Sequence, residues 1–208
     1  MIESEEYFKK GGISVISHAA ARKTLLTALE RSPIIAAVKS EEQLEHCLES
    51  ECTVVFLLFG NVCNIASLVE KVKNADKLAF VHMEFIDGLA PREISVQFIR
   101  QFTKADGILT TKQQLIRCAK EQGLIAVQRF FMIDSIAFSN VQKQLHAGDA
   151  DFIEILPAVL PKILKGICEG THIPVIASGM IVDKEDVLLS LNCGAAGISS
   201  TNPNVWFM

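Results

Sequence analysis

Short apolar runs alternate with longer amphipathic stretches from residue 33 to the C-terminus, and this alternation constrains the fold more than any other feature of the chain. The runs are rich in Val, Ile and Leu, as in strands buried on both faces. Helix-start signals lie between them, such as Ser40 before Glu41 and Asp183 before Lys184. The pattern predicts parallel strands joined by crossover helices. Strands are expected at residues 34–38, 53–59, 78–84, 107–111, 125–131, 152–156, 174–178 and 195–200.

Eight such steps favour an α/β fold in which the sheet closes, a (β/α)8 TIM-type barrel, although an open doubly wound sheet stays an alternative. The 208 residues lie near the lower length limit for such a barrel. Half of them are apolar, enough for one continuous core. We therefore expect a single domain over residues 18–208.

Both ends of the chain depart from the simple repeat. A helix-like stretch at residues 18–31 precedes the first strand, and only residues 201–208 follow the last. We predict an extra N-terminal helix and a short or missing eighth helix, whose gap the first helix could fill. Residues 1–17 include the Gly11-Gly12 break and are interpreted as an N-terminal tail outside the barrel, whose mobility the sequence leaves open.

Bulk properties predict a cytoplasmic protein. The longest purely apolar stretch, residues 54–59, is far shorter than the roughly 20 residues that cross a bilayer. The six cysteines have no CxxC spacing and are interpreted as small buried hydrophobic residues in a reducing compartment. The formal charge of −4 provides no field that would attract nucleic acid non-specifically.

Polar residues at predicted strand ends are the first candidates for a site, because ligands of these barrels bind where the strands end. The two-residue period of a strand puts His82 and Glu84 on one face, as an acid–base pair or as satisfied core residues. Arg129 lies within an apolar strand and needs an anionic partner, for which Glu154 is the candidate. That pair either only braces the barrel, or Arg129 also binds a phosphate or hydroxyl of a ligand.

The two closing strands carry the strongest signal. Small and hydroxyl-bearing residues end both of them, and in many barrels the loops after strands seven and eight bind phosphate through backbone N–H groups. Asn202-Pro203 can start a short helix whose N-terminus favours an anion. The alternative is ordinary turn chemistry. The candidate phosphate-binding residues are Ser178, Gly179, Ser199, Ser200 and Thr201, with Lys39 as a further contact at the rim.

Enzymatic readings remain open at this point. The sequence has no nucleophile beside a recognisable base, no P-loop and no metal cluster. A His82/Glu84 pair beside a phosphate site could still isomerise or cleave a sugar phosphate. A metal-dependent hydrolase would need Glu84, Asp87 and Glu154 to gather around a divalent ion.

Four segments resemble bacterial glycerol-3-phosphate-responsive antiterminators, the glycerol uptake operon regulators. They are residues 85–89 (FIDGL), 127–135 (VQRFFMIDS), 153–157 (IEILP) and 198–202 (ISSTN) with Trp206. The run at 129–135 is the most specific, and the similarity extends from about residue 33 to residue 206. The family pattern has Gly in place of Ser178 and Ala158 and often Asn in place of Asp87.

The resemblance implies a regulator rather than an enzyme. It implies glycerol 3-phosphate as the effector ligand, no cofactor, and the leader mRNA of a glycerol-catabolism operon as the partner that the liganded protein stabilises. The phosphate would lie at the loops after strands seven and eight, and the glycerol hydroxyls near Glu84, Arg129 or Glu154. Arg100, Lys104, Arg117 and Lys120 are weighed as RNA contacts, but a solvated helix face explains each better, so no RNA-binding residue is assigned. The oligomeric state is left open.

Overall fold

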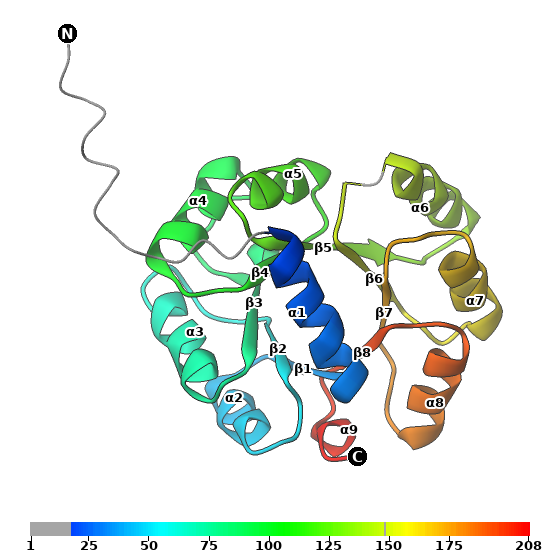
Figure 1. Cartoon of the computed structure of the whole chain (residues 1–208), viewed down its shortest axis with the longest axis horizontal. Helices are drawn as coiled ribbons and strands as arrows, with labels where there is room; N and C mark the ends of the chain where they lie inside the picture. Colours follow the sequence, from blue (N-terminus) through cyan, green and yellow to red (C-terminus); the bar gives the residue numbers. More distant parts are fainter. Residues whose placement is uncertain (1–17, 148) are drawn as a thin grey trace, which may run out of the picture.

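Parallel strands pair in sequence order, and the last strand returns to pair with the first, so the sheet closes into a barrel (Figure 1). The computed structural model describes residues 18–147 and 149–208, and within them the barrel has eight strands. The strands are β1 (Ile34–Val38), β2 (Val54–Leu57), β3 (Leu78–His82), β4 (Gly107–Thr110), β5 (Ile125–Phe131), β6 (Phe152–Leu156), β7 (Val175–Ser178) and β8 (Gly197–Ser200). The predicted (β/α)8 TIM-type barrel is confirmed.

A helix follows each strand and covers the outside of the barrel (Figure 1). Ser40 and Asp183 cap α2 and α8 as predicted, each accepting a hydrogen bond from a backbone N–H three residues ahead. The helices are α1 (His18–Arg31), α2 (Glu41–Leu48), α3 (Ile65–Asn74), α4 (Glu93–Phe102), α5 (Gln113–Glu121), α6 (Ser135–Ala147), α7 (Pro161–Glu169), α8 (Lys184–Asn192) and α9 (Pro203–Trp206). None of the described helices is long and apolar enough to cross a membrane.

The strands separate two apolar cores. One lies between the sheet and the outer helices, and the other fills the barrel, where Phe56 and Phe80 pack with their ring centroids 5.5 Å apart. Alternate residues of each strand therefore point inward, which is why the inner side of the strands ends in side chains that face the barrel mouth.

Helix α1 closes one end of the barrel, so the idea that it replaces the eighth helix is wrong. Leu25 and Leu29 of α1 are buried and belong to the interior core, and Figure 1 shows α1 lying across the barrel. His18 Nε2 also lies 3.0 Å from Asp151 Oδ2, at the start of β6. Helix α1 can bury its apolar face there because the N-terminal end of the barrel is otherwise open to water.

The short eighth helix is confirmed, and it covers its own gap. Helix α9 packs against β1 and α2. Trp206 of α9 is almost completely buried, and its indole N–H donates to the carbonyl oxygen of Ser200 over 2.8 Å. The Trp206 side chain thus covers the part of the barrel that a longer eighth helix would cover.

Strand β3 is shorter than predicted. It ends at His82, and residues Met83–Phe85 form a 3₁₀ turn, η1. The expectation that the strand period places His82 and Glu84 on one face is therefore wrong. The predicted tail, residues 1–17, lies outside the described residues.

Candidate functional site

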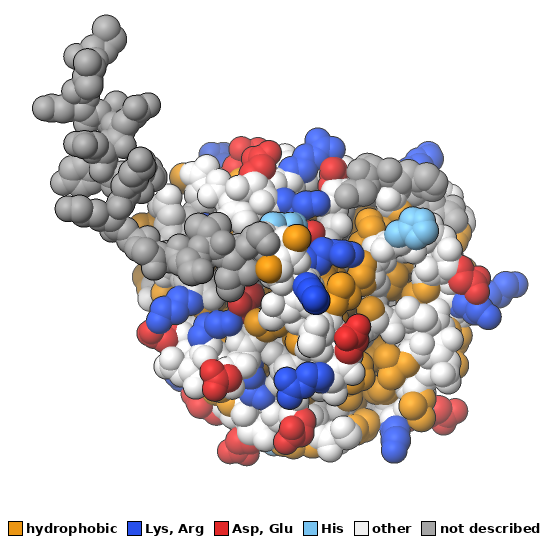
Figure 2. Space-filling view, viewed as in Figure 1, with side chains coloured by type: hydrophobic (Ala, Val, Ile, Leu, Met, Phe, Trp, Pro, Cys, Tyr) orange, Lys and Arg blue, Asp and Glu red, His pale blue; other side chains and the backbone are white. Residues whose placement is uncertain are grey.

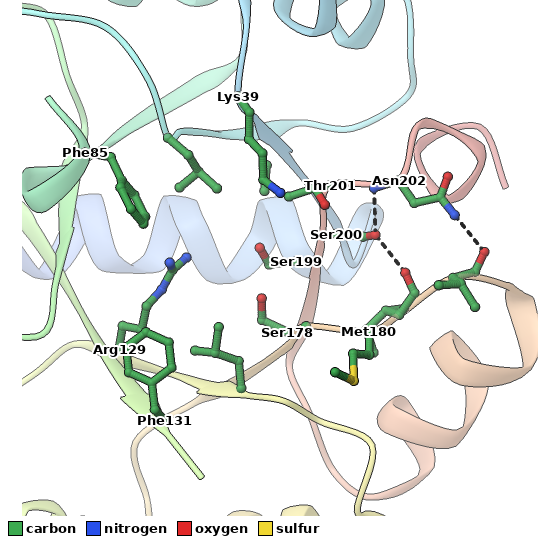
Figure 3. A pocket seen from close by; sticks show the side chains of 16 residues that line it. Lys39, Phe85, Arg129, Phe131, Ser178, Met180, Ser199, Ser200, Thr201 and Asn202 are labelled. Carbon is green, nitrogen blue, oxygen red and sulfur yellow. Dashed lines mark hydrogen bonds between the residues drawn. The ribbon is translucent and has the colours of Figure 1, made fainter. Parts of the chain in front are cut away.

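A cavity of about 570 Å³ lies at the C-terminal ends of β1, β5, β7 and β8 (Figure 3). Its polar side chains come from residues far apart in the sequence, which the barrel brings together. Lys39 follows β1, Arg129 is in β5, Ser178 ends β7, and Thr201 follows β8. The other lining residues are Ala37, Leu58, Phe85, Phe131, Leu156, Gly179, Met180, Ile181, Val182, Ser199, Ser200 and Asn202.

Arg129 and Glu154 form a buried ion pair at the floor of this cavity. The strands place them side by side in register, and the Arg129 Nε–H donates to Glu154 Oε2 over 2.5 Å. Their side chains are 5% and 0% exposed. The predicted partnership is confirmed, and Glu154, which does not line the cavity, holds Arg129 in place.

The pair leaves the terminal nitrogens of Arg129 available to a ligand. Only Nε is engaged by Glu154, and in the described part of the chain the guanidinium has no other hydrogen-bond partner. Figure 3 shows the terminal nitrogens facing the same space as the hydroxyls of Ser178 and Ser199. A planar fork held this way suits an oxyanion.

The loop after β7 presents backbone donors to the cavity. Gly179 and Met180 both have positive φ, 77° and 60°. Their backbone N–H groups, and that of Thr201, donate to no acceptor among the described residues. A Cβ on Gly179 would lie 3.2 Å from Leu156 Cβ, so only glycine fits this approach without displacement. Unpaired N–H groups beside a cavity are the donors that bind phosphate in other barrels.

The three predicted hydroxyl residues of β8 and its loop differ in what they offer. Ser199 Oγ is buried without a partner among the described residues, so a ligand oxygen would satisfy it. Thr201 lines the cavity. Ser200 also lines it, but its hydroxyl donates to the carbonyl oxygen of Ile181 over 2.9 Å and accepts the Asn202 N–H. Ser200 therefore ties the loop after β8 to the loop after β7.

The cavity lining carries positive charge only. Lys39 and Arg129 are its charged residues, and no acidic side chain belongs to the lining set given above. Figure 3 shows the Lys39 side chain reaching toward Thr201. The sequence signal for Lys39 was only its position directly after a strand. The aromatic residues Phe85 and Phe131 had no sequence signal as cavity residues.

Glu84 of η1 does not belong to the lining set, and its carboxylate lies at the C-terminal end of β4. Its Oε1 accepts hydrogen bonds from the hydroxyls of Thr110 and Thr111, at 2.6 and 3.1 Å, and from the Thr111 N–H at 2.9 Å. Burial opposes ionisation of Glu84. His82, Thr110 and Thr111 outweigh that effect and lower the pKa of Glu84 to about 2.

His82 meets Glu84 by way of the η1 turn. Its Nδ1 lies 3.2 Å from Glu84 Oε2, within ion-pair distance, but without the angular geometry of a hydrogen bond. The Phe85 ring packs against the His82 ring, with centroids 4.2 Å apart, and Phe85 lies on the cavity side. The pair that a sugar-phosphate isomerase or lyase would use is thus outside the cavity lining.

The metal-dependent alternative finds no support in the described residues. The Glu84 carboxylate accepts a hydrogen bond from the end of β4, and the Glu154 carboxylate accepts one from Arg129. In residues 18–147 and 149–208 no group of three or more His, Cys, Asp or Glu side chains is arranged to hold a metal ion.

Most of the basic residues weighed for RNA are engaged in internal contacts. Lys104 Nζ lies 3.0 Å from Glu70, Arg117 Nε 2.9 Å from Asp149, and Lys120 donates to the Asp149 carbonyl oxygen over 2.8 Å. On the α1 face, basic and acidic side chains are interspersed (Figure 2). Both observations favour a solvated helix face.

We compared the chain with known protein families and with individual proteins. The family model described as glycerol-3-phosphate responsive antiterminator matches residues 34–206. The uncharacterised protein YgcP of Escherichia coli (strain K12) is 40% identical over 182 residues, which cover 88% of this chain and 95% of that protein.

Solved structures agree with the family match. The glycerol uptake operon antiterminator regulatory protein of Listeria monocytogenes str. 4b F2365 has a TM-score of 0.81 and 30% identity, over 84% of this chain and 95% of that chain. A glycerol uptake operon antiterminator-related protein of Thermotoga maritima MSB8 has a TM-score of 0.74 and 33% identity, over 84% and 98% of the chains. More distant barrels include enzymes, such as a putative phosphonomutase of Burkholderia cenocepacia J2315 with a TM-score of 0.69 and 11% identity, over 89% and 94% of the chains, and these show the fold alone.

Proposed function

The chain belongs to the glycerol-3-phosphate responsive antiterminator family, and from this premise we propose that its barrel-mouth cavity binds glycerol 3-phosphate. In the same proposal the liganded protein stabilises the leader mRNA of a glycerol-catabolism operon and prevents a terminator from stopping transcription. The protein acts in the cytoplasm as a regulator, needs no cofactor, and releases its ligand unchanged.

The observation that carries the proposal is the convergence of unpaired donors and positive charge on one cavity. Several donors at the cavity have no free acceptor among the described residues. They are the N–H groups of Gly179 and Met180, the buried Ser199 hydroxyl and the terminal nitrogens of Arg129. No acidic side chain belongs to the lining set, so Arg129 and Lys39 attract a phosphate dianion, and the Glu154 carboxylate behind Arg129 offsets part of that attraction. In this proposal the phosphate lies against the loops after β7 and β8 and within reach of the terminal nitrogens of Arg129.

The ligand couples to RNA binding through the loops that it bridges. Ser200 already ties the loop after β8 to Ile181, and Asn202 Nδ2 donates to the carbonyl oxygen of Val182 over 3.0 Å. A phosphate bound to both loops and to Arg129 adds β5 to this connected unit. The ligand binds more tightly to the arrangement of the rim that RNA binds than to other arrangements, and it therefore increases the population of that arrangement.

Transcription through the operon's leader tests the proposal. Purified protein and RNA polymerase are combined with a template that carries the leader terminator, with and without glycerol 3-phosphate. Readthrough is expected to rise only when both protein and ligand are present, and Arg129→Ala is expected to need much more ligand. Readthrough that does not respond to glycerol 3-phosphate would contradict the proposal.

A further inference from the structure

The cavity has a second wall that a glycerol phosphate does not use. Opposite and around the polar groups it is lined by Leu58, Phe85, Phe131, Leu156, Met180 and Val182. In Figure 3, Phe85 and Phe131 lie on the Arg129 side of the cavity and Met180 on the other side. The site is therefore amphipathic, with a polar part and an apolar part that share one space.

The apolar wall is partly open to solvent. Phe85 and Phe131 are each 48% exposed, and Met180 is 70% exposed. Large apolar side chains that gather around a cavity mouth indicate a surface that a ligand covers. A ligand made only of a glycerol and a phosphate is polar on all sides, and it would leave these side chains in water.

The size of the cavity agrees with a larger ligand. About 570 Å³ falls within the range of roughly 300–1,000 Å³ that is typical of sites for drug-sized molecules. A three-carbon phosphate fills a small part of that space.

We infer that this cavity accepts a phosphate monoester that carries an apolar substituent, such as a short acyl chain on a glycerol phosphate. The inference rests on the proposed phosphate site. The phosphate lies against Arg129, Lys39, Ser199 and the N–H groups after β7, and the substituent lies between Met180 and the rings of Phe85 and Phe131.

Calorimetric titration of the full chain with a matched pair of esters tests the inference. The ligands are 1-acetyl- and 1-hexanoyl-glycerol 3-phosphate, below any micelle-forming concentration, with glycerol 3-phosphate alongside. Both esters have the same charge and the same ester group. Each methylene that becomes fully buried is worth about fourfold in affinity, so the four further methylenes are expected to tighten binding at least about tenfold even when only partly buried.

Two substitutions locate the effect. Phe131→Ser is expected to reduce the ratio of hexanoyl to acetyl affinity severalfold. Phe102→Ser is the matched control, because Phe102 is also an exposed phenylalanine and ends α4 outside the cavity lining. The control is expected to keep the wild-type ratio.

The outcomes separate the inference from the proposed function. Equal affinity for the two esters, with glycerol 3-phosphate still bound, overturns the inference and leaves the proposed function in place. Binding of the hexanoyl ester with no binding of glycerol 3-phosphate supports the inference and replaces the proposed effector. If no phosphate ester binds, both are overturned.

Discussion

Arg129 divides its nitrogens between the fold and the cavity. Nε is engaged by the buried carboxylate of Glu154, and the terminal pair of nitrogens faces the space beside Ser178 and Ser199. The two interpretations that the sequence left open, a bracing ion pair or a ligand contact, are thus compatible with one geometry. A lysine could serve the first role and place a point charge near a phosphate, but it could not hold Glu154 and at the same time offer a planar fork to the ligand.

Arg129→Lys is therefore expected to weaken binding of glycerol 3-phosphate about tenfold or more, since a hydrogen bond to a charged group contributes about 1.5–3 kcal/mol. Calorimetry measures the affinity, and thermal unfolding checks that the fold is retained. Arg31→Lys at the exposed end of α1 is the control. Wild-type affinity in Arg129→Lys would remove Arg129 from the site.

Glu84 gives a prediction on pH. Its pKa is lowered from 4.5 to about 2 by His82, Thr110 and Thr111 against the opposing effect of burial. A carboxyl whose pKa is depressed by folding stabilises the protein above its unfolded pKa, and that contribution is lost as pH falls toward the folded value.

Glu84→Gln is therefore expected to lower the free energy of unfolding at pH 7, and the difference from wild type is expected to shrink between about pH 5 and pH 2. Denaturant unfolding at several pH values measures this difference. A constant difference across that range would show that the loss comes from packing and not from ionisation.

Among the elements, the loop after β7 is the most constrained part of the site. Gly179 combines a positive φ of 77° with backbone and side-chain atoms of Leu156 and Pro157 within 3.2–3.6 Å of an added Cβ. Gly123 after α5 has nearly the same φ, 74°, with nothing within 4 Å of such a Cβ. A comparison of substitutions at the two glycines therefore separates the effect of the left-handed backbone from the effect of crowding.

Both Gly179→Ala and Gly123→Ala are expected to cost about 1–2 kcal/mol of stability from the left-handed backbone alone. Gly179→Ala should cost more, because the neighbours have to move, and should weaken glycerol 3-phosphate binding by displacing the N–H groups of the loop. Denaturant unfolding and calorimetry on both variants check this. Equal effects of the two substitutions would show that crowding at Gly179 plays no part.

The sequence predicts which strands exist better than it predicts where they begin and end. The alternation of apolar runs predicted all the strands of the barrel, because a strand buried on both faces needs a continuous apolar run. It could not predict the end of β3. Residues 83–85 suit a strand as well as a turn, and the 3₁₀ turn accompanies hydrogen bonds that Thr110 and Thr111 donate to Glu84, which are tertiary contacts. The apolar wall was missed for a similar reason, since Phe85 and Phe131 come to line one cavity only in the closed barrel.

For the whole molecule, the barrel separates stability from function at its two ends. Helix α1 closes the N-terminal end through Leu25 and Leu29, and the candidate site lies at the C-terminal end. The sequence predicted the helix but not its place, because an amphipathic helix can bury its apolar face at either an open barrel end or a gap between helices.

Leu25→Ala is expected to cost about 2–5 kcal/mol of stability, as a fully buried leucine in a closed core does. Binding of glycerol 3-phosphate at a temperature where the variant is folded is expected to be unchanged. Chemical denaturation and calorimetry provide the two readouts. A large loss of affinity in the folded variant would contradict the separation of the two ends.

We propose that the positively charged cavity at the barrel mouth binds glycerol 3-phosphate without consuming it. The most direct test is a calorimetric titration of the full chain with glycerol 3-phosphate, with glycerol and inorganic phosphate as controls, followed by recovery of the ligand. Saturable binding of glycerol 3-phosphate is expected, with no binding of glycerol, weaker binding of inorganic phosphate, and the ligand recovered intact. Absence of binding, or conversion of the ligand to another compound, would contradict it.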